Sequence, residues 1–319
     1  EPAANGKSST WYAITRRVEA FPGSPAPVPA EAVTGTGPES QATTETATSG
    51  VWTEQGNGVY SYKFQKSVFS EPPYDASLPH RVGLEIRVGS PVVPANNAVY
   101  TFTPATNLPL ESSGREIVDN DTCNACHDNL AFHGGARFDL QYCVMCHESY
   151  SFDAQTCNTI DLKVMIHKIH SGANLSNAYG IFGNSNYWHD YSEVVYPQDR
   201  RNCTTCHEEN DADTPQASNW RTVVNIETCT SCHDGIVVDA RTNSLTGEGH
   251  GGVAATADTC TACNGPNSGV LSVEKAHVIP EKAAAAKFAL EVLSVTDTAP
   301  GQFPTVTIRV VDPTNGNTP

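Results

Sequence analysis

The sequence predicts three consecutive segments of different fold class: an antiparallel β barrel or sandwich, a loop-rich and mostly irregular segment with short helices, and the beginning of a second β domain. Residues 1–115 contain short apolar runs and no cysteine, whereas all 11 cysteines and all but one of the 11 histidines lie within residues 116–285. The chain has 24 glycines and 21 prolines in 319 residues, so turns are frequent and long regular elements are few. We therefore expect domain boundaries near residues 115 and 285.

The first segment is predicted to be antiparallel because its short strand candidates are separated by turn signals. Gly56-Asn57-Gly58 separates two apolar runs and is typical of a tight hairpin turn. Residues 21–50 are rich in Pro, Ala, Thr and Ser, and we expect them to form a long surface loop. The strand candidates, which share apolar alternation or β-branched and aromatic residues, are 11–18, 51–53, 59–64, 82–88 and 99–102.

The third segment, residues 286–319, returns to the alternating pattern of a strand pair. Leu290 and Val292 alternate in the first run, and Val306, Ile308 and Val310 alternate in the second. Two strands alone do not make a stable unit in water. We therefore interpret this segment as the beginning of another β domain that is truncated in this chain.

The middle segment, residues 116–285, repeats the motif Cys-x-x-Cys-His. This spacing is typical of covalent attachment of haem c, because two thiols reach the two vinyl groups of one porphyrin and the adjacent histidine becomes an axial ligand of the iron. We expect five haem c groups, four of them on complete motifs. The motifs are Cys123/Cys126/His127, Cys143/Cys146/His147, Cys203/Cys206/His207, Cys229/Cys232/His233 and Cys260/Cys263/Asn264.

Zinc sites and disulfides are the two alternative interpretations of the cysteine pairs, and both explain the pattern less well than haem c. A zinc ribbon uses the same Cys-x-x-Cys spacing, but it gives no reason for a histidine directly after four of the five pairs. A disulfide within Cys-x-x-Cys is more typical of redox motifs than of structural cross-links. Cys157, the eleventh cysteine, has no partner in this pattern, and we expect it to be a buried free thiol.

Electron-transfer haems need a second axial ligand, and the remaining histidines supply candidates. His133 and His250 are flanked by glycines that let a porphyrin approach the backbone. Residues 160–170 are predicted to form a helix that ends at Ser171-Gly172. His167 and His170 are three residues apart on it and can bind two different haem irons. We expect His80, in the β segment, not to be a ligand. The predicted distal ligands are His133, His167, His170, His250, His277 and His189.

Composition limits the function classes. The formal net charge is −16, which argues against binding nucleic acid through phosphate neutralisation. No apolar run is long enough for a transmembrane helix, and the first residues lack the basic and apolar regions of a signal peptide. Haem c is attached outside the cytoplasm, so we expect that an export signal was removed or left out. We expect the Asp-Asn-Asp cluster at residues 119–121 to form a solvated turn rather than a calcium site.

The middle segment resembles the extracellular decahaem outer-membrane cytochromes of metal-reducing bacteria (the OmcA/MtrC type). The residues that carry the resemblance are 132–137, between two attachment motifs, and residues 164–170 and 196–203. The resemblance is close over residues 115–282, whereas the β segments share only their general type with the family. The resemblance implies alternating β and five-haem domains, bis-histidine ligation, and a lipoprotein on the outer cell surface. The chain departs from the family in having half of its haem motifs and in Asn264.

We expect extracellular electron transfer through closely spaced haems, delivering respiratory electrons to minerals, flavins or other cytochromes. Such a chain is an electron-transfer protein rather than an enzyme with its own substrate site, and no catalytic residue is predicted. The resemblance implies other multihaem cytochromes or an outer-membrane porin–cytochrome complex as partners. Two alternatives stay open: a multihaem reductase with an open haem at Cys260/Cys263, and a subunit that self-assembles into a cytochrome filament.

Overall fold

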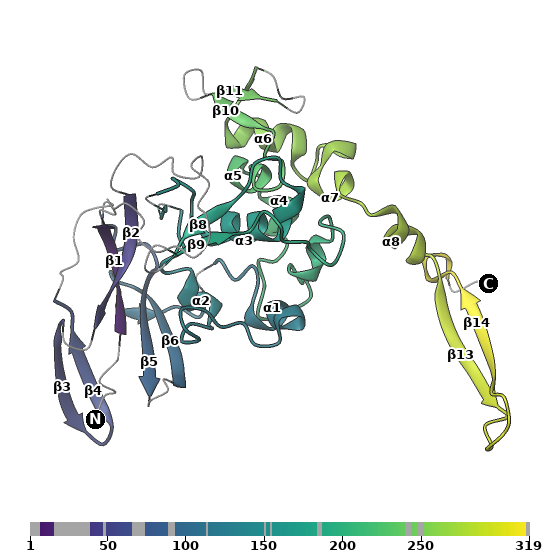
Figure 1. The fold of residues 1–319 in the computed structure, drawn as a ribbon, viewed down its shortest axis with the longest axis horizontal. Helices are drawn as coiled ribbons and strands as arrows, with labels where there is room; N and C mark the ends of the chain where they lie inside the picture. The colour runs from purple at the N-terminus through teal and green to yellow at the C-terminus, as the bar shows by residue number, and fades with distance from the viewer. Residues whose placement is uncertain are drawn as a thin grey trace.

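The computed structural model has an antiparallel β region, a central segment of short helices and loops, and a hairpin that extends away from the rest (Figure 1). Every strand pair is antiparallel, and most helices are a few residues long, which confirms the predicted fold class. The structure describes residues 7–15, 39–46, 49–65, 74–88, 93–112, 114–149, 151–153, 155–183, 187–239, 244–247, 250 and 252–316.

The largest sheet has the strand order β2-β1-β5-β6-β7. The predicted strand at 82–88 is present and begins two residues earlier, and the strand predicted at 99–102 begins at Val93 because it pairs with β5 over nearly its whole length. The five strands are β1 (Lys7–Thr15), β2 (Glu39–Thr46), β5 (His80–Val88), β6 (Val93–Thr103) and β7 (Leu108–Pro109).

The prediction of one long surface loop over 21–50 is wrong in part. Residues 39–46 form β2, which pairs with β1 from Lys7 to Thr15. This stretch is rich in threonine, a residue that favours strands, but the partner that supplies its backbone hydrogen bonds is distant in sequence and invisible to a composition argument. Residues 21–38 and 47–48 lie outside the described residues.

The predicted hairpin is confirmed as β3 (Val51–Gly56) and β4 (Val59–Lys63). Its turn residues Gly56, Asn57 and Gly58 have φ angles of 85°, 54° and 77°, the left-handed region that glycine and asparagine tolerate best. The hydroxyl of Tyr62 on β4 donates to the buried carboxylate of Glu45 on β2 (2.8 Å), which ties the hairpin to the large sheet.

The large sheet is attached to the central segment through buried polar contacts. The fully buried carboxylate of Glu85 on β5 pairs with the guanidinium of Arg137 (2.7 Å). The side chain of Asn97 on β6 donates to the carbonyl of Ala136 (2.9 Å) and accepts from the backbone N–H of Phe138 (2.9 Å). At Gly83 on β5, an added Cβ would lie 2.6 Å from the sulfur of Met145, so only glycine allows this close approach.

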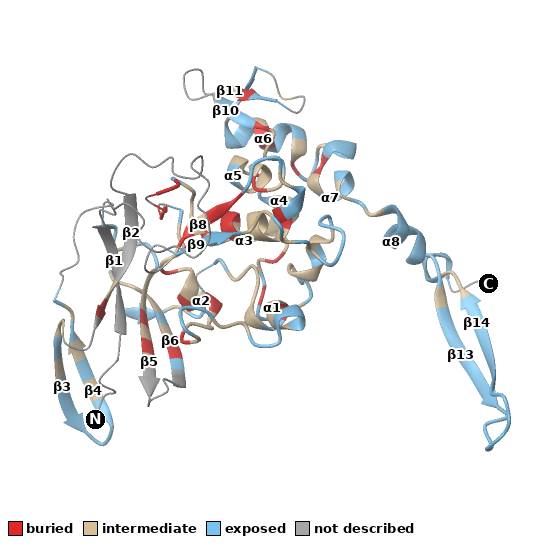
Figure 2. Cartoon of the chain, in the orientation of Figure 1, coloured by how far each residue is buried: buried red, intermediate tan, exposed pale blue. Residues whose placement is uncertain are grey.

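The central segment has little regular structure, yet the buried apolar side chains of the described residues lie in it, from Ala136 to Cys260 (Figure 2). The helix predicted at 160–170 is present as α3, where the side chain of Asp161 accepts from the N–H of Lys163 at the start and Gly172 follows the last residue. The helices are α1 (Asn120–His127), α2 (Leu140–Cys143), α3 (Leu162–Ser171), α4 (Asn219–Thr222), α5 (Ile226–Thr230), α6 (Ala257–Asn264), α7 (Val273–Ala276) and α8 (Pro280–Ala285). The short strands are β8 (Gly180–Phe182), β9 (Trp188–Asp190), β10 (Val237–Asp239), β11 (Ser244–Thr246) and β12 (Val253–Ala254), and 3-10 turns cover Gly172–Asn174, Cys203–Thr205, Gly269–Leu271 and Pro313–Asn315.

The last two strands, β13 (Ala289–Thr296) and β14 (Thr305–Val311), form a hairpin beyond α8 (Figure 1). Its apolar side chains are open to solvent, with Leu290 70% exposed and Ile308 50% exposed. The strand pair predicted here is confirmed, whereas its membership of a further β domain remains a prediction. Within the described residues, no helix combines the length and apolar character that crossing a bilayer requires.

Candidate haem-binding centres

Each attachment motif lies at a short helical turn, and four of these helices begin with a side-chain cap. The capping side chain accepts a hydrogen bond from the backbone N–H three residues later, which fixes where the helix starts. At Cys143, Cys203 and Cys229 the backbone carbonyl accepts from the N–H of the motif histidine at 2.9–3.0 Å, so both thiols and the imidazole leave one turn. The caps are Asp119 for α1, Asp139 for α2, Asn225 for α5 and Thr256 for α6.

The histidines of the four complete motifs each lie beside one of the predicted distal histidines. Two imidazoles bonded on opposite sides of one metal, at about 2 Å per nitrogen, have ring centres about 6 Å apart. Packed rings span a similar range, but packing alone gives no reason for every motif histidine to meet another histidine. The ring centroid distances are 6.0 Å for His127–His170, 6.1 Å for His133–His147, 6.3 Å for His167–His207 and 6.0 Å for His233–His277.

Backbone carbonyls orient several of these rings. Nδ1 of His147 donates to the carbonyl of Ile160 (2.9 Å), Nδ1 of His170 to that of Ile166 (3.0 Å), and Nδ1 of His277 to that of Val273 (2.7 Å). A carbonyl can only accept, so Nδ1 carries the hydrogen and the lone pair remains on Nε2. This arrangement suits metal ligation, in which the second ring nitrogen is held by the protein.

Burial favours the neutral, metal-binding form of four histidines in these pairs. Desolvation lowers the pKa of His147, His167 and His170 below the usual value for histidine. For His207, burial and then the nearby His167 lower the pKa to about 4. A protonated imidazole cannot coordinate iron, so these surroundings favour ligation at neutral pH.

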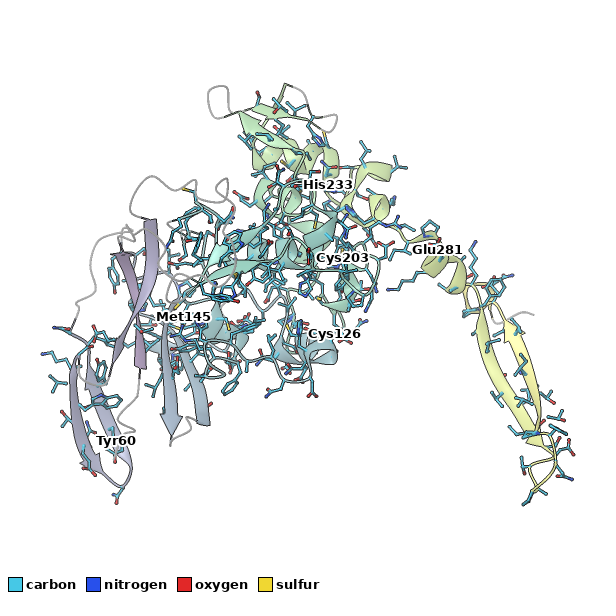
Figure 3. The ribbon with its side chains drawn as sticks, viewed as in Figure 1. Tyr60, Cys126, Met145, Cys203, His233 and Glu281 are labelled. Atoms are coloured by element: carbon cyan, nitrogen blue, oxygen red, sulfur yellow. The ribbon has the colours of Figure 1, made fainter. Side chains whose placement is uncertain are left out.

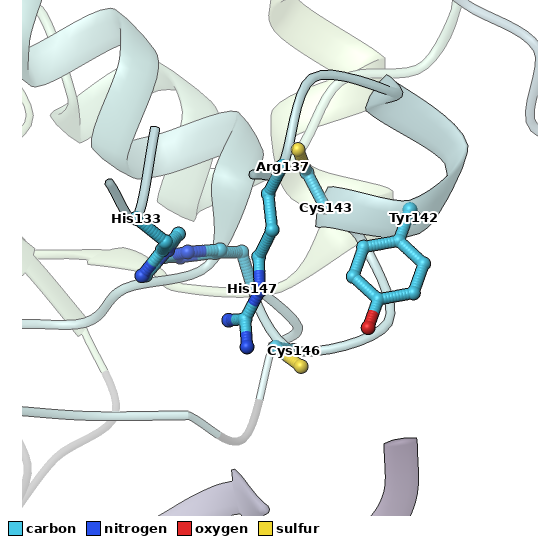
Figure 4. A pocket seen from close by; sticks show the side chains of 6 residues that line it. All are labelled: His133, Arg137, Tyr142, Cys143, Cys146 and His147. Atoms are coloured by element: carbon cyan, nitrogen blue, oxygen red, sulfur yellow. The ribbon is translucent and has the colours of Figure 1, made fainter. Parts of the chain in front are cut away.

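One cavity collects a complete set of haem-binding groups (Figure 4). It is lined by the thiols of Cys143 and Cys146, the imidazoles of His133 and His147, and the side chains of Arg137 and Tyr142. The guanidinium carbon of Arg137 lies 5.9 Å from the centre of the Tyr142 ring. Two thiols with a facing pair of imidazoles match what haem c requires, so the residues present fit this cofactor.

The remaining three histidines lie elsewhere. His189 is on β9, with its ring centroid 4.9 Å from that of Tyr187 and 6.4 Å from that of Tyr191. His80 is on β5, where a ring nitrogen lies 3.1 Å from the carbonyl oxygen of Asp75. His250 is half-buried in the turn between β11 and β12.

The cysteines of successive centres lie close enough to influence one another. Burial is the main cause that raises the pKa of Cys123, Cys143 and Cys203 to about 11 each, and it also raises the pKa of Cys206 and Cys229. A smaller contribution comes from a thiol of another motif, and such an interaction falls off within a short distance. The inter-motif neighbours are Cys143–Cys123, Cys123–Cys206, Cys206–Cys126, Cys203–Cys232 and Cys229–Cys260.

These neighbours arrange the five motifs in one row. The motif at Cys143 comes first, followed by those at Cys123, Cys203, Cys229 and Cys260. In Figure 3, Met145 lies toward the large sheet, Cys126 lies to its right, and Cys203 and then His233 follow above Cys126. The first two motifs are therefore in reverse order relative to the sequence.

Sequence reasoning missed one aromatic side chain at these centres. The ring of Tyr196 lies 5.5 Å from that of His170, and its hydroxyl interacts with the thiol of Cys206. The one signal in the sequence that could have identified Tyr196 is its position in the segment 196–203, which resembles the cytochrome family. The prediction for Cys157 was wrong: this thiol is exposed, on a residue whose φ of 57° belongs to a turn. Asp119 belongs to a helix cap and not to a free turn.

Comparison with known proteins gives consistent results. A family model described as outer membrane cytochrome MtrC/MtrF-like, domains II/IV, matches residues 115–278. The multihaem cytochrome MtrC of Shewanella baltica (strain OS185) is 27% identical over 224 residues, which cover 67% of this chain and 29% of that protein. The fold is similar to the crystal structure of the outer membrane decahaem cytochrome OmcA, with a TM-score of 0.70, 23% identity, and coverage of 99% of this chain and 49% of that chain. The chain thus spans less than a third of the first relative and about half of the second.

Proposed function

The chain belongs to the MtrC/MtrF-like outer membrane cytochromes, which bind haem c, and we propose that it conducts electrons along a row of five covalently attached haems. One observation carries this proposal: four motifs of the row each have their histidine paired with a second histidine, with ring centroids 6.0–6.3 Å apart. A row of redox centres that are close together lets an electron move from one to the next without diffusing.

In this proposal, each motif histidine and its facing histidine hold one iron. Haem c would supply an iron that changes between two oxidation states, and the two imidazoles of each pair would hold that iron and leave no position on it for a substrate. The half-buried imidazoles of His147, His170 and His277, whose Nδ1 atoms are held by backbone carbonyls, support this assignment. The assigned pairs are His127 with His170, His147 with His133, His207 with His167, and His233 with His277.

We further propose that the chain works at the outer cell surface and passes electrons to minerals, flavins or other cytochromes. The family supports an outer-membrane setting, and the MtrC-like relative supports partnership with other cytochromes or a porin–cytochrome complex. The domain plan proposed with it is a β domain over 1–115, a five-haem domain over 116–285 and a further β domain from 286 onward. The exposed apolar side chains of β13 and β14 support the last part.

The test is to produce the chain in a host that attaches haem c, and to determine its haem content, spin state and reactivity. We expect mass spectrometry to find five porphyrins and electron paramagnetic resonance to find at least four low-spin ferric haems. The dithionite-reduced protein should be reoxidised rapidly by flavin mononucleotide and by ferric citrate. Four porphyrins would contradict the count of five haems, whereas fewer than four, bound zinc, or mainly high-spin iron would contradict the electron-conduit proposal itself.

A further inference from the structure

The fifth attachment motif differs from a complete motif at one residue only. Helices α1 and α6 each have eight residues, begin at a side-chain cap, and place cysteines at their fourth and seventh positions. The eighth position is His127 on α1 and Asn264 on α6. Because the two helices match in length, cap and cysteine positions, Asn264 stands where His127 stands relative to its thiols.

Asparagine is a poor substitute for histidine as an iron ligand. Imidazole nitrogen suits haem iron, whereas an amide oxygen suits hard ions such as magnesium or calcium. The amide group of Asn264 also carries two N–H donors, which histidine bound to iron does not offer on that side. The side chain is half-buried, so it can act on a small molecule beside it.

The supply of other imidazoles near this motif is small. Eight histidines of the central segment are in the four ring pairs, and His189 packs against Tyr187 and Tyr191. His250 is the histidine outside these pairs that is nearest to the motif in sequence: it precedes β12, and β12 ends at Ala254, shortly before α6 begins at Ala257. Among the described residues, the fifth motif therefore has one candidate imidazole for two axial positions.

The fifth motif is also at the end of the row and partly open to solvent. Its inter-motif neighbour is Cys229, whose pKa is raised by burial and then by Cys260. Cys260 is buried, whereas Cys263 is exposed. Burial raises the pKa of Cys260, and the carboxylate of Glu227 makes a smaller contribution in the same direction.

We propose that the haem on Cys260 and Cys263 has an exchangeable axial position beside Asn264, which binds small molecules of the diatomic class. The inference rests on the proposed covalent attachment of five haems. In it His250 is the single imidazole ligand, and the Asn264 amide donates a hydrogen bond to the bound molecule. The other four centres are closed by two imidazoles each.

The test uses carbon monoxide as the probe on the fully reduced, five-haem protein, with stoichiometry followed by the Soret absorption change. We expect one carbon monoxide per chain. Asn264→His should reduce binding to less than about a tenth of that value, because it supplies the missing imidazole. The matched converse variant, His127→Asn on α1, should raise binding to two per chain.

Several outcomes would overturn the inference. If the five-haem protein binds no carbon monoxide, the inference is wrong. The electron-conduit proposal would remain intact, because the four low-spin haems on which it depends are measured separately. Four porphyrins with free thiols at Cys260 and Cys263 would also overturn the inference. Unchanged binding in Asn264→His would do the same, provided that mass spectrometry finds all five haems. If Asn264→His fails to fold, His127→Asn still tests the inference. Binding of only one carbon monoxide per chain in His127→Asn would show that asparagine at this position does not open the haem iron to a ligand.

Discussion

Single buried polar residues decide how the sheet and the haem-binding segment are held together. Glu85 is fully buried on β5, and its partner Arg137 lies between two attachment motifs and lines the cavity with His133 and His147. Burial by itself lowers the pKa of Arg137, but the hydrogen bond and charge of Glu85 outweigh it and the pKa is raised. The pair therefore stays charged, and removing one member leaves a desolvated charge.

Replacing Glu85 by glutamine should lower the free energy of unfolding by about 3 kcal/mol, since breaking a buried ion pair from one side leaves the other charge without compensation. Urea denaturation followed by circular dichroism measures this loss. The matched control is Glu291→Gln, because Glu291 pairs with Arg309 at 3.0 Å on the open hairpin and both side chains are more than half exposed. A surface pair contributes less than about 1 kcal/mol. Equal losses in the two variants would show that the buried pair does not hold the segments together.

At the scale of elements, helix α3 serves two centres at once. His167 and His170 are three residues apart on it, and they face motif histidines of two different motifs, His207 and His127. The carbonyl of Ile166 within the same helix accepts from Nδ1 of His170, so the helical backbone itself orients a ligand. The geometry of both centres thus depends on this one helix remaining intact.

A helix-breaking substitution in α3 should therefore remove two low-spin haems together. Proline at position 166 lacks the backbone N–H and clashes with the preceding turn, at a cost of about 3 kcal/mol or more. Electron paramagnetic resonance of Ile166→Pro should lose the signals of two centres, whereas His170→Ala should lose one. Ile166→Ala is the control and should keep all four low-spin signals. Loss of a single signal in Ile166→Pro would contradict the shared role of the helix.

At the scale of the whole molecule, the order of the centres would set the path of electrons in the proposed conduit. The motif at Cys203 is in the middle of the row, with two motifs on either side, and the motif at Cys143 is at one end beside the large sheet. Loss of a middle centre divides the row, whereas loss of an end centre only shortens it. The sequence order of the motifs would instead put the Cys123 motif at the end.

The double variant C203S/C206S should split the haems into two pools that exchange electrons slowly. Rapid reduction from a photoexcited donor, followed by absorption spectroscopy, should give two separate phases in this variant. In C143S/C146S, the end-of-row control with the same number of cysteines removed, electrons should equilibrate among the remaining haems in one phase. Identical kinetics in the two variants would refute the proposed order.

The local features of this chain were predictable because their causes are local. Both thiols and the motif histidine come from one helical turn, so the Cys-x-x-Cys-His spacing alone indicates haem c. The hairpin at Gly56-Asn57-Gly58 follows from backbone angles that few residues tolerate. The helix at α3 follows from its cap at Asp161 and its end at Gly172. In each case the deciding contacts join residues that are close in the sequence.

The sequence by itself determined the positions of the five Cys-x-x-Cys pairs, from which haem attachment is predicted, and that a pool of further histidines could complete the ligation. Only the tertiary structure decided which histidine faces which motif, that the motif at Cys143 precedes the one at Cys123 in the row, and that residues 39–46 pair with β1. The physical reason is that these choices depend on contacts between distant parts of the chain. His127 and His170 are far apart in sequence, and loops that wrap several centres carry no periodic pattern from which such contacts can be inferred.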